Sequence, residues 1–250
     1  PAILNPVLAS DSASAEINDL VFSGLVKFDK NLNLTGDLAE KWEIKDGGLI
    51  IIFYLKKNVK WHDGAPFTAK DVKFTYDIYM APETKTAYRS LFEPVKNVIV
   101  IDDYTVKVNY KKPFAPALQY WGTGILPSHL LEGKDINTAV FNRAPVGTGP
   151  YTFKNWKTGR SVELMANKDY FDGAPYISNY LFRIIPDQSV QFMNLQAGSL
   201  DMMTLSSDLY FTKANTEDFN KKFNKYIVPA FQYTYIGYNQ NNPLFAPVKI

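Results

Sequence analysis

Hydrophobic residues at helical spacing predict an amphipathic helix near the start of the chain. These apolar positions are Ile17, Leu20, Val21 and Leu25. Asp11, Ser12 or Ser14 can accept a backbone hydrogen bond in the first turn of such a helix. Gly24 lies near its expected end.

Alternation of apolar and polar residues predicts two β-hairpins. The paired runs are 42–44 with 49–55, and 97–102 with 105–110. The first pair flanks Lys-Asp-Gly-Gly, which is a strong signal for a hairpin turn. The second pair turns at Asp102-Asp103, and Pro113 ends its last strand because proline cannot donate to a ladder.

Further helices and strands alternate along the rest of the chain. A helix is expected from Thr68, because Asp71 three residues later completes a capping-box pattern. A second helix is expected from Ser189, with Gly198 closing it. Residues 113–145 are expected to be irregular or helical. Strand-like runs lie at 151–156, 161–166 and 179–185, and in the tyrosine-rich tail 224–242. This mixture indicates an α/β or α+β fold.

Composition narrows the functional classes. Aromatic residues make up 15% of the 250 residues, which suits both packed cores and clefts for extended ligands. The 27 basic and 25 acidic residues are scattered, which argues against a nucleic-acid footprint and a polybasic membrane surface. The absence of cysteine excludes disulfides, thiol catalysis and zinc–cysteine clusters, and leaves no lipoprotein attachment point in these residues. The most apolar run, 49–55, is too short to span a bilayer.

The stretch NRAPVGTGPYTF, residues 142–153, contains the glycine spacing that suggests a phosphate-binding loop. A P-loop needs a lysine after its last glycine, whereas Gly149 is followed by Pro150 and Tyr151. Proline also removes one of the N–H donors of such a cradle. The stretch precedes a predicted strand instead of a helix N-terminus. We therefore predict a bend that glycine permits, leading into a strand.

Other candidate chemistry is weak. His62 is expected to lie half-exposed in a turn and His129 at a helix start, and neither belongs to a metal-ligand spacing. No Gly-x-Ser-x-Gly nucleophile elbow is present. Adjacent Asp102 and Asp103 fit a hairpin turn better than a glycosidase pair, because neighbouring strand residues point to opposite faces. These patterns leave catalysis unsupported.

The tyrosines of the tail admit two interpretations. They are Tyr233, Tyr235 and Tyr238. Tyr233 and Tyr235 share one face if the segment is a strand. They can cover a sheet, or they can line a cleft where the phenol groups stack and form hydrogen bonds. The sequence leaves both interpretations open.

The order of several motifs resembles one known family. The motifs are DLAEKWEI, LKKNVKWHDGAPFTAKDVKFTYD, GTGPYTFKNW, LQAGSLDMM and GYNQNNPLF. Together they resemble the oligopeptide-, dipeptide- and nickel-binding proteins of ABC importers, the extracellular solute-binding proteins of family 5. The resemblance runs along essentially the whole chain.

The resemblance implies an α/β fold of the periplasmic-binding-protein type (type II, cluster C). Residues 1–22 and 128–250 would form a first ligand-binding lobe, and residues 23–127 an inserted small α+β domain. Relatives continue with a second lobe, which is absent from this chain. We therefore expect the sequence to be a segment of a longer protein. The acidic residue that pairs with a peptide's amino terminus would lie in that second lobe.

The resemblance also implies where ligand contacts lie. The matching positions are Ser10, Asp11 and Ser12 before the first helix, Tyr88 in TAYRSLF, Met203, Thr204 and Leu205 after GSLD, and Phe231 and Tyr235 in the tail. A purely structural role competes at each position, since loop residues beside a helix often only cap it.

The implied function is that of the substrate-binding component of an ABC importer. It would capture an extended ligand, most simply a short peptide, between two lobes and deliver it to the membrane permease. A monomer without cofactor, metal, enzymatic activity or nucleic-acid partner is expected, in the periplasm or elsewhere outside the cytoplasm, with or without a lipid anchor. Relatives suggest alternative ligands: a nickel chelate, haem, an opine or an oligosaccharide. A sensor domain and a carboxylate-dependent hydrolase remain the competing classes.

Overall fold

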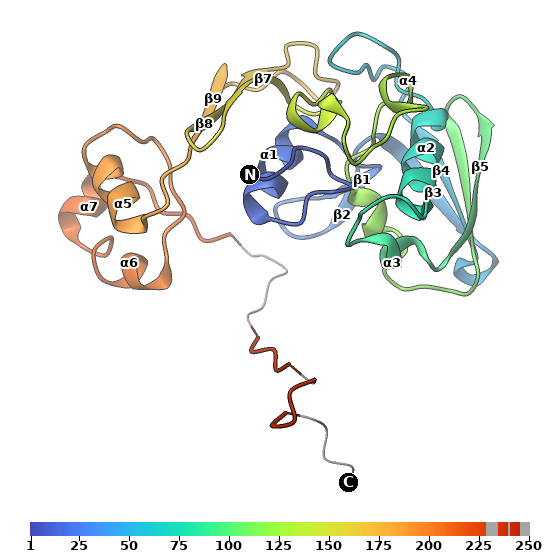
Figure 1. Cartoon of the computed structure of the whole chain (residues 1–250). Coiled ribbons are helices and arrows are strands. Elements are labelled where there is room, and N and C mark those ends of the chain that lie inside the picture. The colour runs from blue at the N-terminus through green and yellow to red at the C-terminus, as the bar shows by residue number, and fades with distance from the viewer. Residues whose placement is uncertain (229–234, 240, 246–250) are drawn as a thin grey trace. The chain divides into compact units, whose positions relative to one another are not determined.

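The computed structural model describes residues 1–228, 235–239 and 241–245. The chain divides into two compact units (Figure 1). Unit 1 comprises Pro1–Asp29 and Asn33–Thr204, and unit 2 comprises Lys30–Leu32 and Leu205–Ile250. Unit 1 contains residues of both predicted parts, 1–22 with 128–204 and 23–127, and that predicted division stays a prediction.

Unit 1 contains three antiparallel sheets. A two-stranded sheet pairs β1 (Val26–Phe28) with β2 (Leu34–Gly36). A four-stranded sheet has the order β3-β4-β6-β5, formed by β3 (Ala39–Lys45), β4 (Ile50–Leu55), β5 (Val95–Asp102) and β6 (Thr105–Tyr110). A three-stranded sheet has the order β7-β8-β9, formed by β7 (Tyr151–Lys157), β8 (Ser161–Ala166) and β9 (Asn179–Arg183).

Short helices connect these sheets. The α-helices of unit 1 are α1 (Ser12–Val21), α2 (Ala69–Met80), α3 (Arg89–Phe92), α4 (Ser128–Leu131) and α5 (Gln188–Gln196). Turns of 3₁₀-helix occupy Asp46–Gly48, Gln119–Gly122 and Val140–Arg143. No helix among the residues described is long and apolar enough to cross a membrane.

The described part of unit 2 contains two short helices, each started by a side-chain cap. Ser206 accepts a hydrogen bond from the Leu209 N–H at the start of α6 (Ser207–Phe211). Thr216 accepts one from the Phe219 N–H at the start of α7 (Glu217–Lys222). Leu209, Ala214 and Phe219 are the buried apolar residues of this part. So small a set gives these helices little core of their own.

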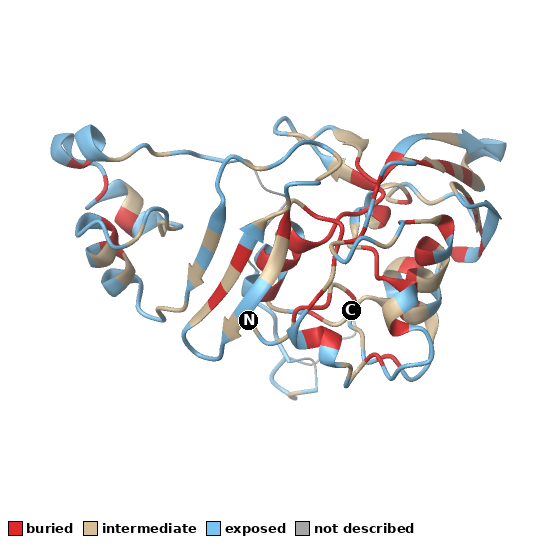
Figure 2. Cartoon of the chain, turned by 90° about the horizontal axis from the view of Figure 1, so that it is seen from above, coloured by how far each residue is buried: buried red, intermediate tan, exposed pale blue. Residues whose placement is uncertain are grey.

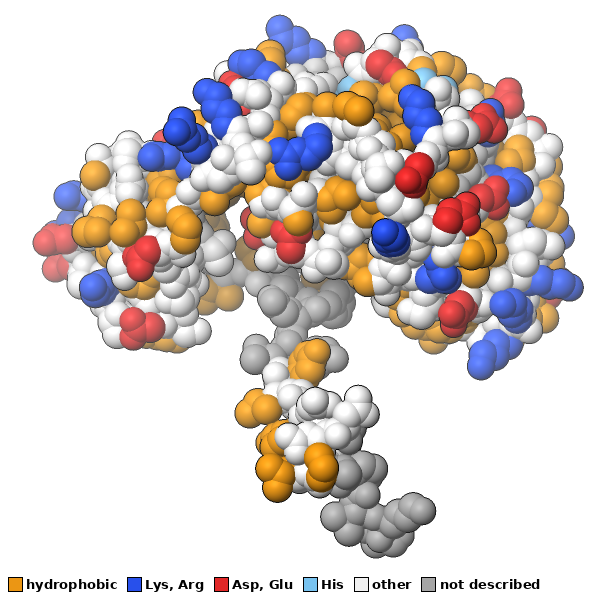
Figure 3. Space-filling view, in the orientation of Figure 1, with side chains coloured by type: hydrophobic (Ala, Val, Ile, Leu, Met, Phe, Trp, Pro, Cys, Tyr) orange, Lys and Arg blue, Asp and Glu red, His pale blue; other side chains and the backbone are white. Residues whose placement is uncertain are grey.

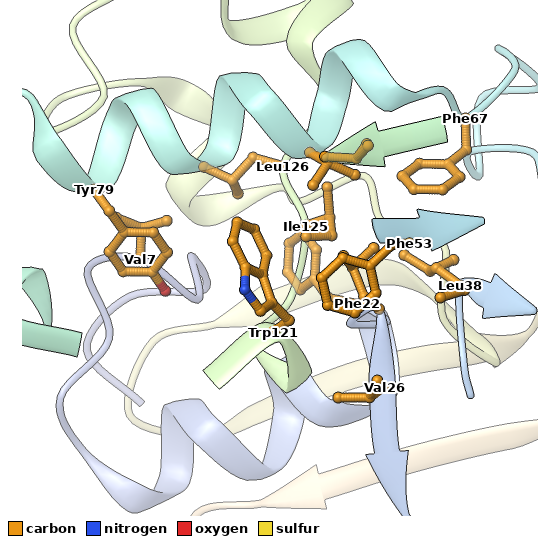
Figure 4. Packing of buried hydrophobic residues seen from close by; sticks show 14 of the residues in the cluster. Val7, Phe22, Val26, Leu38, Phe53, Phe67, Tyr79, Trp121, Ile125 and Leu126 are labelled. Atoms are coloured by element: carbon orange, nitrogen blue, oxygen red, sulfur yellow. The ribbon is translucent and has the colours of Figure 1, made fainter. Parts of the chain in front are cut away.

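The core of unit 1 is one cluster of buried residues that fills the space between α2 and the four-stranded sheet and extends to α1, β7 and β8. Inward positions of β4 and β6 alternate with outward ones, as strand geometry requires. Trp121 is 1% exposed and lies against Phe53 of β4, with ring centroids 5.8 Å apart (Figure 4). Asp71 accepts a hydrogen bond from the Thr68 N–H at 2.9 Å and so caps α2, as predicted. Figure 2 shows the buried positions in red.

Both predicted hairpins and the three predicted strands after residue 150 are confirmed. The helix expected from Ser189 is α5, and Gly198 follows it with φ 73°, the left-handed conformation that glycine favours. The first helix ends earlier than expected, at Val21. Phe22 turns extended there, and Leu25 leaves the helix and donates its N–H to the Trp121 carbonyl at 2.7 Å.

The strand-like prediction for the tail 224–242 is wrong for the residues that are described. Residues 224–228 and 235–239 belong to no strand, and the others of the run up to Gln240 lie outside the described residues. An extended segment becomes a strand only when a neighbour completes its ladder of hydrogen bonds. The alternation of tyrosines predicted a face, but it did not supply a partner strand.

Two chain segments cross each other with their backbones in contact. The segment after α1 runs beside the 3₁₀ turn at Gln119–Gly122, where the Ile125 N–H donates to the Ser23 carbonyl at 3.0 Å. A Cβ atom on Gly24 would lie 2.5 Å from the Gly122 carbonyl carbon. Gly24 is required because any side chain there would separate the two segments, whereas a Cβ atom on Gly122 would lie 3.2 Å from the Val26 carbonyl oxygen, a tight contact.

The stretch around Gly147-Thr148-Gly149 is a structural bend, as predicted, and β7 follows it directly. Neither glycine adopts a positive φ. They are required because the bend lies against the end of α1: a Cβ atom on Gly147 would lie 1.8 Å from the Val21 carbonyl oxygen. The Gly149 N–H donates to that oxygen at 2.9 Å. The bend therefore satisfies a carbonyl that the helix end leaves unpaired.

His62 holds the other side of this bend. Its Nδ1 atom accepts a hydrogen bond from the Gly147 N–H at 3.2 Å, and its Nε2 atom lies 2.9 Å from the Gly149 carbonyl oxygen. The ring must therefore be neutral, with its proton on Nε2. Burial lowers the pKa of His62, although the Gly149 carbonyl opposes this effect. The prediction of a half-exposed histidine in a turn is confirmed, and the hydrogen bonds give it a structural role.

We expect Gly147→Ala to lower the free energy of unfolding by at least about 3 kcal/mol, because the added methyl group must displace backbone. Gly159→Ala is the matched control. Gly159 has φ 69° and no atom within 4 Å of the place that an added methyl group would take, so only backbone strain applies there, about 1 kcal/mol. Urea unfolding of both variants measures the difference. Equal losses would contradict the role of close approach.

We expect part of the stability to depend on the neutral state of His62. The unfolded chain takes up a proton on this ring near its ordinary pKa of 6.5, and the folded chain only at a lower pH. Between these values the unfolded state binds more protons, so stability falls as the pH decreases. His62→Gln should reduce the slope of unfolding free energy against pH by up to about 1.4 kcal/mol per pH unit. Urea titrations between about pH 5 and pH 7 test this. An unchanged slope would contradict it.

Candidate functional site

The pre-helix loop, residues 4–11, carries the first group of predicted contacts and is fixed from its buried side. Asn5 is fully buried and donates from Nδ2 to Oδ1 of Asn142 at 2.8 Å. Its own Oδ1 accepts the Val7 N–H, and its carbonyl accepts the N–H groups of the two residues after Val7. The Leu4 N–H donates to the Asn142 carbonyl at 2.9 Å. One buried asparagine pair therefore sets the path of the loop.

Asp11 caps α1. Its carboxylate accepts the Ser14 N–H at 2.9 Å and the Ser14 hydroxyl at 2.6 Å. Partial burial raises the pKa of Asp11, but the hydrogen bonds from Ser14 outweigh it and hold the pKa below its ordinary value. The structural role considered for this residue is confirmed. A contact between Asp11 and a ligand stays a prediction.

Ser10 lies at the exposed end of the pre-helix loop, next to the cap. Its side chain and that of Ser12 are exposed. Within the part of the chain that the structure describes, neither the N–H nor the carbonyl of Ser10 has a hydrogen-bond partner. An N–H and a carbonyl on one fixed residue are the groups that an extended ligand backbone can pair with. The loop is thus fixed by hydrogen bonds on its buried side and has unpaired backbone groups at its exposed end.

The 81–88 loop, between α2 and α3, is also fixed. The guanidinium of Arg89 donates to the carbonyls of Tyr79, Ala81, Pro82 and Thr84. Asn137 accepts the Lys85 N–H at 2.9 Å and donates to the Glu83 carbonyl at 3.1 Å. A cation at the end of α2 is favourable because the last carbonyls of a helix carry partial negative charge.

Tyr88 is the predicted contact at the end of this loop, and it is half-buried against the core. Its N–H donates to the Thr86 hydroxyl oxygen at 3.1 Å, and the same hydroxyl donates to the Val7 carbonyl at 2.7 Å. The structure therefore places Tyr88 beside the pre-helix loop, although 77 sequence positions separate Tyr88 from Asp11. Two of the predicted contact groups are brought together.

The remaining predicted contacts lie near the end of unit 1 and in unit 2. Met203 is half-buried and Thr204 exposed at the end of unit 1, and the Thr204 carbonyl lies 3.5 Å from the Gln188 amide nitrogen. Leu205 begins unit 2, where Tyr235 is 75% exposed. Phe231 lies outside the described residues. All five stay predictions.

The sequence did not predict the residues whose hydrogen bonds fix the two segments of the site. Asn5, Thr86 and Asn142 each act through a partner far away in sequence, at separations of 79 residues for Thr86 and 137 for the asparagine pair. Local periodicity carries no such information. The only local signal is a buried polar residue in an apolar stretch, as in Leu4-Asn5-Pro6, which must find a hydrogen-bond partner.

Neither a cluster of charge nor a metal site marks the described residues as a binding site of another kind. On the face shown in Figure 3, Lys and Arg side chains occur at separate places with Asp and Glu between them. Among the residues with described positions, no group of three or more His, Asp or Glu side chains is arranged to hold a metal ion. The chemistry of the site is therefore that of backbone groups, hydroxyls and an aromatic ring.

Comparison with known proteins gives a consistent result. The family model "Bacterial extracellular solute-binding proteins, family 5 Middle" matches residues 33–250. The oligopeptide-binding protein AppA of Bacillus subtilis is 38% identical over 260 aligned residues, which cover all of this chain and 46% of AppA. The chain thus spans less than half the length of this relative.

Solved structures agree with the sequence match. AppA from Bacillus subtilis in complex with a nonapeptide has a TM-score of 0.82 at 35% identity, covering 87% of this chain and 44% of AppA. NikZ from Campylobacter jejuni in complex with Ni(L-His) has a TM-score of 0.81 at 35% identity, with the same coverage of 87% and 44%. The mixed α/β fold described above is therefore that of these proteins over the matched part.

We expect Asp11→Ala to lower the free energy of unfolding by about 1 kcal/mol, because it removes the cap of α1. Asp11→Asn keeps an acceptor oxygen in the same place and should stay within about 0.5 kcal/mol of the unsubstituted protein. Urea unfolding compares the two. If Asp11→Asn lost as much stability as Asp11→Ala, the carboxylate charge rather than the cap would be responsible.

Proposed function

The chain belongs to the bacterial extracellular solute-binding proteins of family 5, and from this membership we propose that the protein captures an extended ligand, a short peptide, for an ABC importer. It binds the ligand without converting it and delivers it to the membrane permease outside the cytoplasm. In this proposal residues 1–22 and 128–250 belong to one lobe of a two-lobed type II, cluster C binding protein, and residues 23–127 form its inserted small domain.

The observation that carries the proposal is the exposed, unpaired N–H and carbonyl of Ser10 on a loop that Asn5 and Asn142 fix by buried hydrogen bonds. A peptide in extended conformation can donate to its carbonyl and accept from its N–H, as an added strand does. Such pairing depends on the peptide backbone and not on its side chains. Bridging waters in the remaining space would tolerate varied side chains.

The aromatic ring of Tyr88 supplies the second part of the surface. A half-buried tyrosine offers an apolar face for packing and a hydroxyl for a hydrogen bond. In the proposal a ligand lies with its backbone along Ser10 and a side chain or end against Tyr88. Closure of a second lobe would bury the ligand and form the surface that the permease recognises.

A nickel–amino acid chelate is the second ligand class, because NikZ with Ni(L-His) resembles this chain as closely as peptide-bound AppA does. An amino-acid chelate also presents backbone-type amino and carboxylate groups. The peptide is preferred because one free N–H and one free carbonyl on the same residue suit the repeating donors and acceptors of a peptide chain.

We expect Tyr88→Ala to weaken peptide binding at least about tenfold, which corresponds to about 1.4 kcal/mol. The full-length protein is purified, and native mass spectrometry identifies the ligand that copurifies with it. Calorimetry then measures the affinity of each variant for that ligand. Tyr176→Ala is the matched control, because Tyr176 is a fully exposed tyrosine of unit 1 with relative exposure of 105%. The peptide affinity of the Tyr176→Ala variant should be unchanged.

Native mass spectrometry decides between the ligand classes. A heterogeneous set of bound masses that match short peptides supports the proposal. A single adduct with the mass of nickel and an amino acid would replace the peptide by a chelate. A protein that carries no ligand and takes up neither peptides nor Ni(L-His) would contradict both.

A further inference from the structure

The Thr86 hydroxyl makes two short hydrogen bonds that join the two segments of the candidate site. It donates to the Val7 carbonyl at 2.7 Å and accepts from the Tyr88 N–H at 3.1 Å. A hydroxyl has one donor and two acceptor lone pairs, so both bonds can exist at once. One side-chain atom therefore contacts the pre-helix loop three residues before Ser10 and fixes the backbone of Tyr88.

The other bonds of the 81–88 loop do not provide this link. Arg89 bonds to carbonyls of α2 and of the loop itself, and Asn137 holds the loop at Glu83 and Lys85. The Tyr79 hydroxyl approaches the Pro6 carbonyl of the pre-helix loop, but at 3.4 Å, and it lies 2.7 Å from the Thr123 hydroxyl. Among the described residues, the short polar contact between the two site segments is the one made by Thr86.

We propose that Thr86 is a positioning residue for ligand binding: its hydroxyl sets the distance and orientation of Tyr88 relative to the unpaired backbone of Ser10. This inference rests on the proposed function. The ligand it serves is an extended peptide whose backbone pairs with Ser10 while one side chain packs on Tyr88. Without the hydroxyl, the two segments are each still fixed, but only apolar packing and the longer contact from Tyr79 to Pro6 define their relative placement.

Loss of the Thr86 hydroxyl should weaken binding by lowering the fraction of molecules in the binding-competent arrangement. Apparent affinity falls in proportion to the fraction of molecules that have the binding-competent arrangement. Thr86→Val keeps the shape of the side chain and removes both hydrogen bonds, and we expect about 5- to 10-fold weaker peptide binding. Thr86→Ser keeps the hydroxyl and should restore affinity to within about twofold. If Thr86→Val does not fold, Thr86→Ala provides the same comparison.

Thr75→Val is the matched control. The Thr75 hydroxyl also joins two distant segments: it donates to the Asp71 carbonyl at 2.8 Å and accepts the Leu126 N–H at 2.9 Å. It lies in the core, with 1% exposure, and contacts neither site segment. Both valine variants should lower the urea midpoint, and only Thr86→Val should weaken peptide binding. This comparison separates positioning from general stability.

The last test is the double variant Thr86→Val with Tyr88→Ala. Calorimetry measures its affinity for the copurifying peptide. If Thr86 acts through Tyr88, the double variant should bind about as weakly as Tyr88→Ala alone. Thr86→Val with unaltered affinity beside a weakened Tyr88→Ala would overturn the inference and leave the proposed function standing. Equal weakening by Thr75→Val and Thr86→Val would also overturn it. If the unsubstituted protein binds no peptide, the proposed function fails first.

Discussion

Close contact between backbones at glycine is the constraint on which the rest of unit 1 depends. The chain leaves α1 through a segment that crosses the 3₁₀ turn at Gln119–Gly122, where Gly24 leaves no room for a Cβ atom. At the other side of α1, Gly147 and Gly149 lie against the carbonyls of the helix end. These contacts fix the C-terminal end of α1 and the segment that follows it. Because the pre-helix loop runs directly into α1, they also fix the frame of the candidate site.

The sequence predicted local structure well wherever one short segment contains the cause. Asp11 and Thr68 begin helices because a cap needs only neighbouring residues, and both hairpins follow from alternation around a turn. The sequence also predicted a bend at Gly147-Thr148-Gly149, but the physical reason differs. A left-handed backbone is not involved; the glycines permit contact with Val21, which is far away in sequence. The prediction of a strand in the tail was wrong for a related reason: a strand depends on a partner outside its own segment.

The candidate site shows the same division between local and distant causes. Ser10, Asp11 and Tyr88 came from resemblance, and the structure brings the two segments that carry them into contact. The interactions that bring them together come from Asn5, Thr86 and Asn142, whose partners no local pattern specifies. Ionic contacts add a further connection elsewhere: Lys27 of β1 bonds Asp172 at 2.8 Å and lies 3.2 Å from Asp37, whose side chain is 7% exposed. Such long-range polar contacts make the two predicted parts of unit 1 one body.

A fixed loop with free backbone groups has a consequence for specificity. Ordering a loop on binding costs free energy, and a loop already ordered by buried hydrogen bonds avoids that cost. Affinity can then come from the ligand backbone, which every peptide shares. The similar TM-scores to peptide-bound AppA and to NikZ with Ni(L-His) indicate that the backbone of this part of the family does not itself distinguish the two ligands. Side chains in this part, and the more than half of each compared protein that lies outside the match, are left to distinguish the ligands. Under the proposed function, the spacing between Ser10 and Tyr88 would contribute to ligand choice as well as to affinity.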